Sequence, residues 1–308
     1  MIILNNTYHV PVLLEECIKG LNINPEGVYV DLTFGGGGHS KAILDKLSNT
    51  GQLFAFDKDK DALKNAFDDT RFCLIEDDYA NMNKQLRLFR ITQVDGILAD
   101  LGISSHQIDD ASRGFSFRFD APLDLRMDTS GMFNATDLIN RYSEQELSQL
   151  FFNYAEIPNA KILAHNICKA RKDKPIETTF ELCDIMRKTV QSNVEQKFFA
   201  KVFQALRIEV NHELRSLNIM LSQCADILKP QGRLVVMSYH SLEDKLVKNI
   251  MRSGNTKGEV KKDFYGNVMT PYYIITRKPI VPSELEMQQN PRSRSAKLRI
   301  AQRKEVKA

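Results

Sequence analysis

Short apolar runs that end in acidic or turn residues recur through the N-terminal third of the chain. The runs VYVDL (28–32), QLFAFD (52–57), FCLIE (72–76) and VDGILADL (94–101) are typical of buried strands. Helix-like segments near residues 39–48 and 59–67 lie between the first three. Because strands that alternate with helices build parallel sheets covered on both faces, this region predicts an α/β fold.

A helical period replaces this alternation after residue 101. It runs through the segments DLINRYSEQELSQLFFNY, AKILAHNICKARK, TFELCDIMRKTV and KVFQALRIEVNHELRSLNIMLSQCADILK. The last segment is expected to end at Lys229 and to lead into a buried strand, GRLVVMSY (232–239). A helix, SLEDKLVKNIM, and a last strand, YYIITR (272–277), follow.

The helical stretch is longer than a connection between two strands requires, which predicts a second domain. We expect residues 1–109 and 206–308 to form one α/β domain with a mostly parallel sheet. Residues 110–205 are expected to form a helical subdomain inserted into it.

Four consecutive glycines, Gly35 to Gly38, follow the first predicted strand and precede a helix. Bare backbone at this point of an α/β fold allows a nucleotide-like cofactor to approach closely. NAD would favour the spacing G-x-G-x-x-G, but the sixth position is Ser40 when counted from Gly35 and Lys41 when counted from Gly36. The loop therefore fits a dinucleotide poorly.

Acidic residues around the loop fit S-adenosylmethionine better, because this cofactor carries a sulfonium, an ammonium and a ribose diol. Asp31 precedes the loop, and Asp57 ends the second strand, where a ribose-binding carboxylate belongs. Tyr79 follows the third strand and could stack on adenine, and Asp100 ends the fourth, towards the reactive end of the cofactor. The alternative is a glycine-rich turn with solvated aspartates.

The loop after the fourth strand combines aromatic and basic residues. Its sequence, ADLGISSHQIDDASRGFSFRFDAPLDLRMD, contains Phe115, Phe117 and Phe119 together with Arg113, Arg118 and Arg126. Such a mixture can stack on a nucleic-acid base and hold phosphate. The alternative is an edge hairpin that buries alternate phenylalanines on the inserted subdomain.

The segment SYHSLED (238–244) is expected at the mouth of the strand that precedes it. His240, with Ser241 beside it, could orient a base or relay a proton, although a loop histidine is often structural. Glu243 and Asp244 fall in the first turn of a helix, where carboxylates also serve as caps.

Composition adds a few limits. Apolar residues make up 43% of the chain and charged residues 26%, as in ordinary globular proteins. No apolar run suits a membrane span or a signal peptide, so a cytoplasmic location is expected. The five scattered cysteines predict neither disulfides nor a metal site. The segment from residue 292 to 307 holds seven Lys or Arg and one Glu, which favours a polyanionic partner unless it is merely a solvated tail.

Taken together, these motifs resemble the bacterial N4-cytosine methyltransferases of small-subunit ribosomal RNA, the MraW/RsmH family. The resemblance rests on DLTFGGGGHS, on the long loop after the fourth strand, and on FQALRIEVNHEL, SYHSLED and NPRSRSAKLRIA, in the order of the family. It implies a class I S-adenosylmethionine methyltransferase domain interrupted by a helical domain.

The resemblance also implies site residues. The cofactor contacts would be Gly35, Gly37, Gly38, His39, Asp57, Tyr79, Asp100 and Gln107. Candidate substrate contacts are Arg113, Phe115, Arg118, Arg126, His240 and Ser241. The implied substrate is a cytosine at the decoding centre of 16S ribosomal RNA in the small subunit, with no DNA or membrane partner.

The implied reaction is an in-line attack of the cytosine amine on the sulfonium methyl group. The site must position this weak nucleophile and accept hydrogen bonds from its N–H groups, a task for Asp100 or for backbone carbonyls near Leu101 and Gly102. The target base has to be unstacked first. Two alternatives remain open, namely an NAD-dependent oxidoreductase and a non-catalytic RNA-binding assembly factor.

Overall fold

The computed structural model of the chain describes residues 11–305, which belong to two compact units. The first unit contains the chain up to Gly102 and again from Leu214, and the second contains Ile103–Glu213.

The second unit is wider on both sides than the inserted segment expected at 110–205. Ile103 packs against its core, and α9 (Glu195–Val210) is one continuous helix whose buried side chains lie in that core. A boundary between residues 205 and 206 would cut this helix, so the unit extends to its end and beyond.

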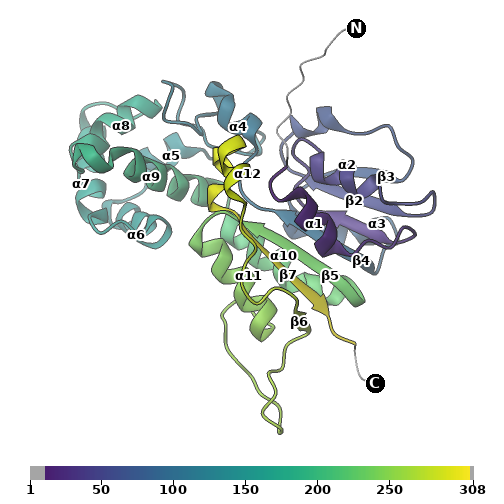
Figure 1. The fold of residues 1–308 in the computed structure, drawn as a ribbon. Coiled ribbons are helices and arrows are strands. Elements are labelled where there is room, and N and C mark those ends of the chain that lie inside the picture. The colour runs from purple at the N-terminus through teal and green to yellow at the C-terminus, as the bar shows by residue number, and fades with distance from the viewer. Residues whose placement is uncertain (1–10, 306–308) are drawn as a thin grey trace. The chain divides into compact units, whose positions relative to one another are not determined.

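A seven-stranded sheet forms the centre of the first unit (Figure 1). Its strands are β1 (Val28–Asp31), β2 (Gln52–Asp57), β3 (Phe72–Glu76), β4 (Val94–Asp100), β5 (Leu228–Ser238), β6 (Tyr272–Ile274) and β7 (Lys297–Arg303). The order is β3-β2-β1-β4-β5-β7-β6, in which β1 to β5 are parallel and β7 is antiparallel to both of its neighbours. The predicted α/β class with a mostly parallel sheet is confirmed.

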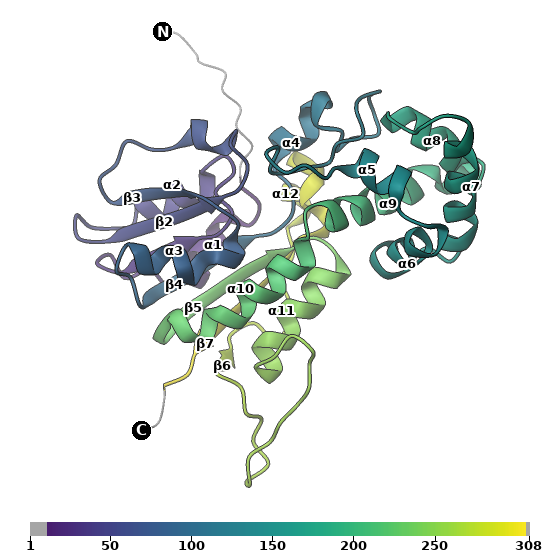
Figure 2. The ribbon, with the colours of Figure 1, turned by 180° about the vertical axis from the view of Figure 1, so that it is seen from behind.

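Helices cover both faces of this sheet. They are α1 (Leu14–Leu21), α2 (Gly38–Leu44), α3 (Met82–Leu88), α10 (Glu213–Ile227) and α11 (Ser241–Ser253). The short helix α12 (Glu284–Gln289) also belongs to this unit but buries none of its residues. Leu86, Leu221 and Val247 join α3, α10 and α11 to one core, and Figure 2 shows α10 and α11 lying across that face. Leu21 and Ile43 join α1 and α2 to a second core on the other face. The burial of apolar side chains on both faces explains why the central strands read as continuous apolar runs.

Two helix predictions were wrong. The segment 59–67 contains only a short 3-10 turn, Ala62–Asn65, because the side chains of Asp57 and Asp59 accept hydrogen bonds from backbone N–H groups two residues further on. The long helix expected to end at Lys229 is divided between α9 and α10, with His212 in a left-handed conformation (φ 52°), and Lys229 already lies in β5.

The described part of the basic C-terminal segment, residues 292–305, is not a solvated tail, which corrects that alternative; residues 306 and 307 lie outside the described residues. Pro291–Ser295 forms a 3-10 turn, and Lys297–Arg303 forms β7, which lies between β5 and β6. Leu298 and Ile300 are buried, whereas Arg299 alternates with them and pairs with Asp244 at 2.6 Å. The period of two that marks this strand was obscured by its charges.

The second unit is helical around a single apolar core. Besides α9, its helices are α4 (Ser105–Asp109), α5 (Ala135–Arg141), α6 (Glu144–Ala155), α7 (Ala160–Asp173) and α8 (Thr179–Arg187). Capping boxes begin α4, α5, α6 and α8, which explains where these short helices start. No helix in residues 11–305 is long and apolar enough to cross a membrane.

Candidate active site

Three aspartates mark one edge of the sheet in the first unit. Asp31, Asp57 and Asp100 are the last residues of β1, β2 and β4, which are parallel strands. The register pairs Asp31 with Ala55 and with Leu98, so the three strand ends lie within two residues of one another along the sheet. Ligands of open α/β sheets bind at this carboxyl edge.

The glycine loop between β1 and α2 requires residues without side chains. Gly35 and Gly37 have positive φ angles of 52° and 77°. A Cβ atom on Gly37 would lie 2.8 Å from the ring of Phe67 and 3.0 Å from that of Phe34. One on Gly38 would meet Pro11 at 2.2 Å. The backbone therefore turns sharply while the surrounding side chains pack against it.

Asp57 holds the start of this loop. Its Oδ2 accepts a hydrogen bond of 2.8 Å from the Gly35 backbone N–H, and its Oδ1 accepts one of 2.9 Å from that of Asp59. Burial raises the pKa of Asp57 to about 6, although these two hydrogen bonds oppose the shift. No fixed cation is among the groups that shift this pKa, so a positively charged ligand would stabilise the carboxylate.

Asp31 makes its contacts inside the protein. It is only 1% exposed, its Oδ2 accepts a hydrogen bond of 2.7 Å from the Ser40 hydroxyl, and its Oδ1 accepts one of 3.1 Å from the Thr33 backbone. Burial raises its pKa. Asp31 therefore connects the end of β1 to the first turn of α2, and its expected part in suiting the loop to a cationic cofactor stays a prediction.

Asp100 lies between an imidazole and a phenol. The Tyr239 hydroxyl donates a hydrogen bond of 2.8 Å to its Oδ1, and Nδ1 of His39 lies 3.8 Å from its Oδ2. The other ring nitrogen of His39 lies 3.2 Å from the carbonyl oxygen of Val12. This carbonyl can only accept, so that nitrogen is the donor of the hydrogen bond. Burial raises the pKa of Asp100 to about 6, and His39 and Tyr239 oppose the shift.

Tyr79 lies three residues after the end of β3. It begins a 3-10 turn capped by Asp78, whose Oδ1 accepts a hydrogen bond of 2.8 Å from the Ala80 backbone. Oδ2 of Asp78 pairs with Lys58 at 3.2 Å and accepts a hydrogen bond of 3.1 Å from Ser216. The half-buried ring of Tyr79 therefore stands on a well-fixed turn at the carboxyl edge.

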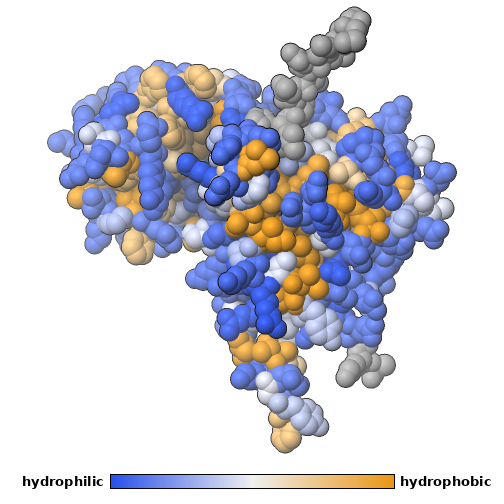
Figure 3. Space-filling model, in the orientation of Figure 1, coloured by the Kyte–Doolittle hydropathy of each residue, from blue (hydrophilic) through white to orange (hydrophobic). Residues whose placement is uncertain are grey.

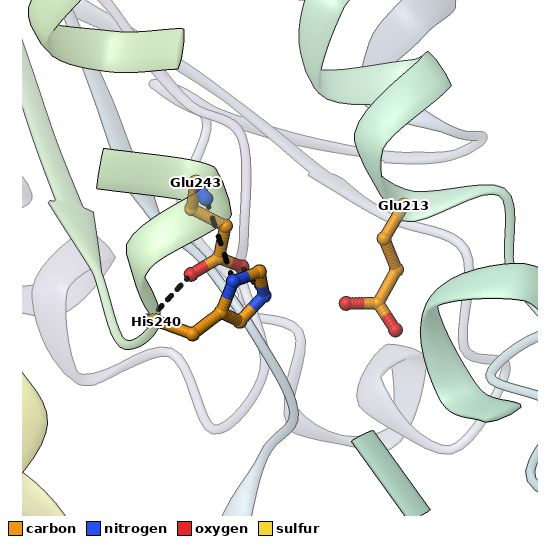
Figure 4. A group of neighbouring side chains, drawn as sticks. All are labelled: Glu213, His240 and Glu243. Carbon is orange, nitrogen blue, oxygen red and sulfur yellow. Dashed lines mark hydrogen bonds and ion pairs between the residues drawn. The ribbon is translucent and has the colours of Figure 1, made fainter. Parts of the chain in front are cut away.

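His240 and Glu243 cap the start of α11, as Figure 4 shows. Nδ1 of His240 accepts a hydrogen bond of 3.4 Å from the Glu243 backbone, and the Glu243 carboxylate accepts hydrogen bonds of 2.9 and 3.3 Å from the backbone N–H groups of Tyr239 and His240. These contacts favour the structural alternative for His240, while Ser241 is exposed. Glu213, also labelled in Figure 4, ends the second unit and pairs with Arg207 at 2.8 Å within it.

The remaining predicted residues belong to the second unit. Gln107 completes the capping box of α4 with Ser104 and is 5% exposed. The Arg113 guanidinium donates hydrogen bonds of 3.0 and 2.9 Å to the backbone carbonyls of Arg126 and Met127. Arg126 itself pairs with Asp124 at 2.6 Å. Both arginines therefore stabilise the conformation of the loop to which they belong.

The aromatic residues of this loop divide between core and surface. Phe115 is buried, and the partly buried Phe117 packs edge-on against Phe203 at 5.5 Å, although the segment before them forms α4 and a 3-10 turn and not the edge hairpin of the alternative. Arg118 and Phe119 are exposed, and 48% of Phe119 is accessible. Among the predicted substrate contacts of the second unit, Arg118 is the one that the structure leaves on the surface.

The comparison with known families decides between the two cofactor classes. The model of the MraW methylase family matches residues 6–304. The chain belongs to this family. Curated relatives named "Ribosomal RNA small subunit methyltransferase H" are 51% identical in Bacteroides thetaiotaomicron, over 97% of this chain and 98% of the relative, and 52% identical in Cytophaga hutchinsonii, over 96% and 99%. A third, from Flavobacterium johnsoniae, is 51% identical over 96% of this chain and 98% of its own length.

Family membership confirms the resemblance drawn from the motifs and the class I methyltransferase fold. The cofactor of this methylase is S-adenosylmethionine, as the glycine loop and its acidic surroundings predicted. The residues present fit such a cationic group. Burial raises the pKa values of Asp57 and Asp100, and a cation beside them would stabilise their ionised forms. The NAD alternative is wrong.

Tyr239 is a site residue that the sequence did not single out as a partner of Asp100. It was noted only as a member of SYHSLED. The signal was present in the order of the strands, because β5 follows the inserted segment and pairs directly with β4. A residue just beyond Met237, the register partner of Asp100, must lie near that carboxylate.

Proposed function

We propose that this chain transfers a methyl group from S-adenosylmethionine to the exocyclic N4 amine of a cytosine in the decoding region of 16S ribosomal RNA. The relatives are named as small-subunit ribosomal RNA methyltransferases, and the motif resemblance supplies the base and the region. The observation that carries the proposal is the row of Asp57, the glycine loop and Asp100 along one sheet edge of a methylase. The substrate would be the small ribosomal subunit or its RNA, in the cytoplasm and with no DNA or membrane partner.

In this proposal the two units have separate tasks. The first unit binds the cofactor, and the second recognises RNA, with Arg118 and Phe119 as its exposed candidate contacts. Within the first unit, Asp57 accepts hydrogen bonds from the ribose hydroxyls, and Tyr79 lies against the adenine. The N–H groups and carbonyls of Gly35, Gly37 and Gly38, together with His39, surround the amino-acid portion. Gln107, which belongs to the second unit, remains a proposed cofactor contact.

The bound cofactor would supply a methyl group on its sulfonium, and the amine nitrogen would form the new N–C bond as the C–S bond breaks and its electron pair stays on sulfur, which leaves as a neutral thioether. The amine is a weak nucleophile, since its lone pair is delocalised into the ring. The protein must therefore hold it in line at about 3–3.5 Å from the methyl carbon. Asp100 accepts a hydrogen bond from the amine as positive charge develops and then receives the released proton. Its pKa of about 6 keeps it ionised near neutral pH yet able to take up a proton.

Backbone carbonyls near Leu101 and Gly102 are the alternative acceptors. Gly102 has a φ of 103°, which allows the chain to turn immediately after Asp100. Asp100→Asn separates the two possibilities because the amide still accepts a hydrogen bond through its oxygen but takes up no proton near neutral pH. A large loss of turnover that persists at saturating cofactor would identify Asp100 as the acceptor.

The proposal is tested by transfer of tritium from labelled S-adenosylmethionine to small subunits that lack the modification. Wild type should incorporate label into one cytosine of the decoding region, and nucleoside analysis should place it on N4. Asp57→Ala should fold normally and bind the cofactor at least tenfold more weakly, because a lost charge-assisted hydrogen bond costs about 1.5–3 kcal/mol. Asp45→Ala is the matched control, since Asp45 is an exposed aspartate of the same unit that pairs with Lys41 at 2.9 Å.

Failure of the wild-type chain to label either free RNA or assembled subunits would contradict the enzymatic proposal. Cofactor-independent binding to the subunit without incorporation would instead support the assembly-factor alternative. Label on a carbon or on ribose would leave the methyltransferase intact but overturn the N4 assignment.

A further inference from the structure

The outer face of α11 carries only positive charge. The exposed residues of this helix are Ser241, Lys245, Lys248 and Arg252. Its two acidic residues point elsewhere, because Glu243 caps the helix and Asp244 pairs with Arg299 at 2.6 Å. Spacings of three and four residues put the three cations on one side of the helix.

A hairpin continues this surface beyond the end of α11 (Figure 1). Gly254, with a φ of 73°, ends the helix, and the chain returns at Thr270, whose hydroxyl donates a hydrogen bond of 3.1 Å to the Met251 carbonyl. Between these points Lys262 pairs with Val268 across an isolated antiparallel bridge. The hairpin base is therefore fixed to the last turn of α11.

The tip of the hairpin presents two aromatic rings to solvent. Asp263 organises the turn by accepting hydrogen bonds of 2.9 and 2.8 Å from the backbone N–H groups of Tyr265 and Asn267. Phe264 is 98% exposed and Tyr265 is 85% exposed, with their rings 5.7 Å apart at 87°. Figure 3 shows the hairpin as a narrow projection with apolar residues along it. Such exposure of two aromatic side chains on an ordered turn is unusual for a solvated loop and marks a contact surface.

The basic face of α11 begins at the carboxyl ends of the parallel strands and runs back towards their amino ends. α11 begins directly after β5, whose Met237 pairs with Asp100, so its first turn lies at the edge of the candidate active site. The helix has 13 residues and therefore runs back for about 20 Å before the hairpin begins. Lys261 and Lys262, both exposed, continue the positive charge towards the tip.

We propose that the outer face of α11 and the hairpin tip form a second contact with the RNA substrate, remote from the methyl-transfer site. Lys245, Lys248 and Arg252 bind phosphates, and Phe264 or Tyr265 stacks on an unpaired base. This inference rests on the proposed RNA methyltransferase function. RNA is favoured over a protein partner because the outer face of α11 has cations and no exposed carboxylates, which fits a polyanion. On the hairpin the exposed Lys257, Lys261 and Lys262 outnumber the exposed Glu259 and Asp263, and aromatic rings beside lysines suit bases beside phosphates.

The phosphate contacts are tested by the salt dependence of binding to small subunits that lack the modification. The triple variant Lys245→Gln, Lys248→Gln, Arg252→Gln should reduce the slope of log K against log salt by about 2, since each lost phosphate contact removes about 0.7 on a single strand. The matched control replaces Lys84, Arg87 and Arg90, three exposed cations on or next to α3 of the same unit, by glutamine. The control should keep the wild-type slope, and equal slopes for the two triple variants would overturn the proposal.

The stacking contact is tested with the double variant Phe264→Ala, Tyr265→Ala. It should weaken binding about fivefold or more without changing the salt slope, and cofactor affinity should stay at the wild-type value. Leu88→Ala, at a residue that is 72% exposed on α3, is the control. The same loss should appear with protein-free 16S ribosomal RNA. A loss confined to the assembled subunit would show that the tip contacts a ribosomal protein, and wild-type affinity for both targets would show that it contacts neither, so either result rejects the inference.

Methyl incorporation by the wild-type chain on the same subunits is a separate readout. A wild type that methylates while both surface variants bind normally would leave the proposed function standing and reject only the second RNA contact.

Discussion

Tyr239 donates a hydrogen bond of 2.8 Å to the carboxylate of Asp100 across the junction of β4 and β5. The phenol thus stabilises the ionised form of a group whose burial favours the neutral form, and the pKa of Asp100 settles at about 6. The pKa of Tyr239 is raised well above its usual value by its own burial and by the carboxylate, so it remains a donor. In the proposed mechanism, this pair would keep Asp100 available as a proton acceptor near neutral pH.

Replacing Tyr239 with phenylalanine should shift the pH dependence of methyl transfer. Loss of a hydrogen bond to a charged acceptor is worth about 1.5–3 kcal/mol, which corresponds to a rise of about one unit or more in the pKa of Asp100. Turnover should therefore begin to fall at a higher pH as the medium is acidified. A pH–rate profile with saturating cofactor measures this, and a midpoint equal to that of wild type would show that Tyr239 does not tune Asp100.

Cofactor affinity should weaken as the pH falls through 6. Burial raises the pKa values of Asp57 and Asp100 to about 6. Because a cationic cofactor binds better when both carboxylates are ionised, its affinity should be highest above pH 6 and should fall as they become protonated below it. One such group gives a roughly tenfold weaker complex at pH 5 than at pH 7. Calorimetric titration across this range provides the measurement. Asp57→Asn should bind more weakly at pH 7 but depend less on pH, and a mutant curve as steep as that of wild type would assign the dependence elsewhere.

Gly37→Ala should damage both the loop and cofactor binding. The added methyl group would lie 2.8 Å from Phe67 in a backbone conformation with φ 77°. Overpacking and a left-handed φ together cost about 2–4 kcal/mol. Chemical denaturation should show this loss, and cofactor affinity should fall at least tenfold. Gly131→Ala is the control, because the added methyl group would meet the Asp128 carbonyl oxygen at 3.7 Å, an ordinary contact distance. Similar stability of the two variants would mean that the loop tolerates a side chain.

Ile300→Ala tests the position of β7. Ile300 is 4% exposed and packs into the core beneath α1, so its truncation should destabilise the first unit by about 2–5 kcal/mol. Val281→Ala, at a residue that is 58% exposed in the same unit, should change stability by less than about 0.5 kcal/mol. If Ile300→Ala were equally neutral, the segment would not be a core strand.

The sequence was most informative for the N-terminal strands, where an apolar run that ends in an acidic residue recurs. The four strands before residue 101 were predicted from their apolar runs, and the aspartates that end β1, β2 and β4 could be placed on one edge by the parallel order alone. The sheet position of β7 could not be deduced in this way, because arginines and lysines fill its outward positions and the buried ones, Leu298 and Ile300, are few.

Side-chain roles were harder to predict than strand positions. A carboxylate before a glycine loop can face the ligand or the protein itself, and the sequence does not predict the contact of Asp31 with Ser40. Likewise, Arg113 and Arg126 have the chemistry of phosphate ligands, yet their partners are carbonyls and a carboxylate of their own loop. The choice depends on local geometry that residue type does not encode.

The position of β7 also determines how the chain can fold. Until residues 297–303 arrive, β5 has no neighbour on one side and β6 has none at all, since β7 is the strand that pairs with both. The first unit is moreover divided in sequence, whereas Ile103–Glu213 is continuous. The helical unit, rich in local contacts, should therefore fold early, and the sheet should close late. A partly synthesised chain carries an open, strongly apolar strand edge, so aggregation during synthesis should depend on how quickly its last strand becomes available.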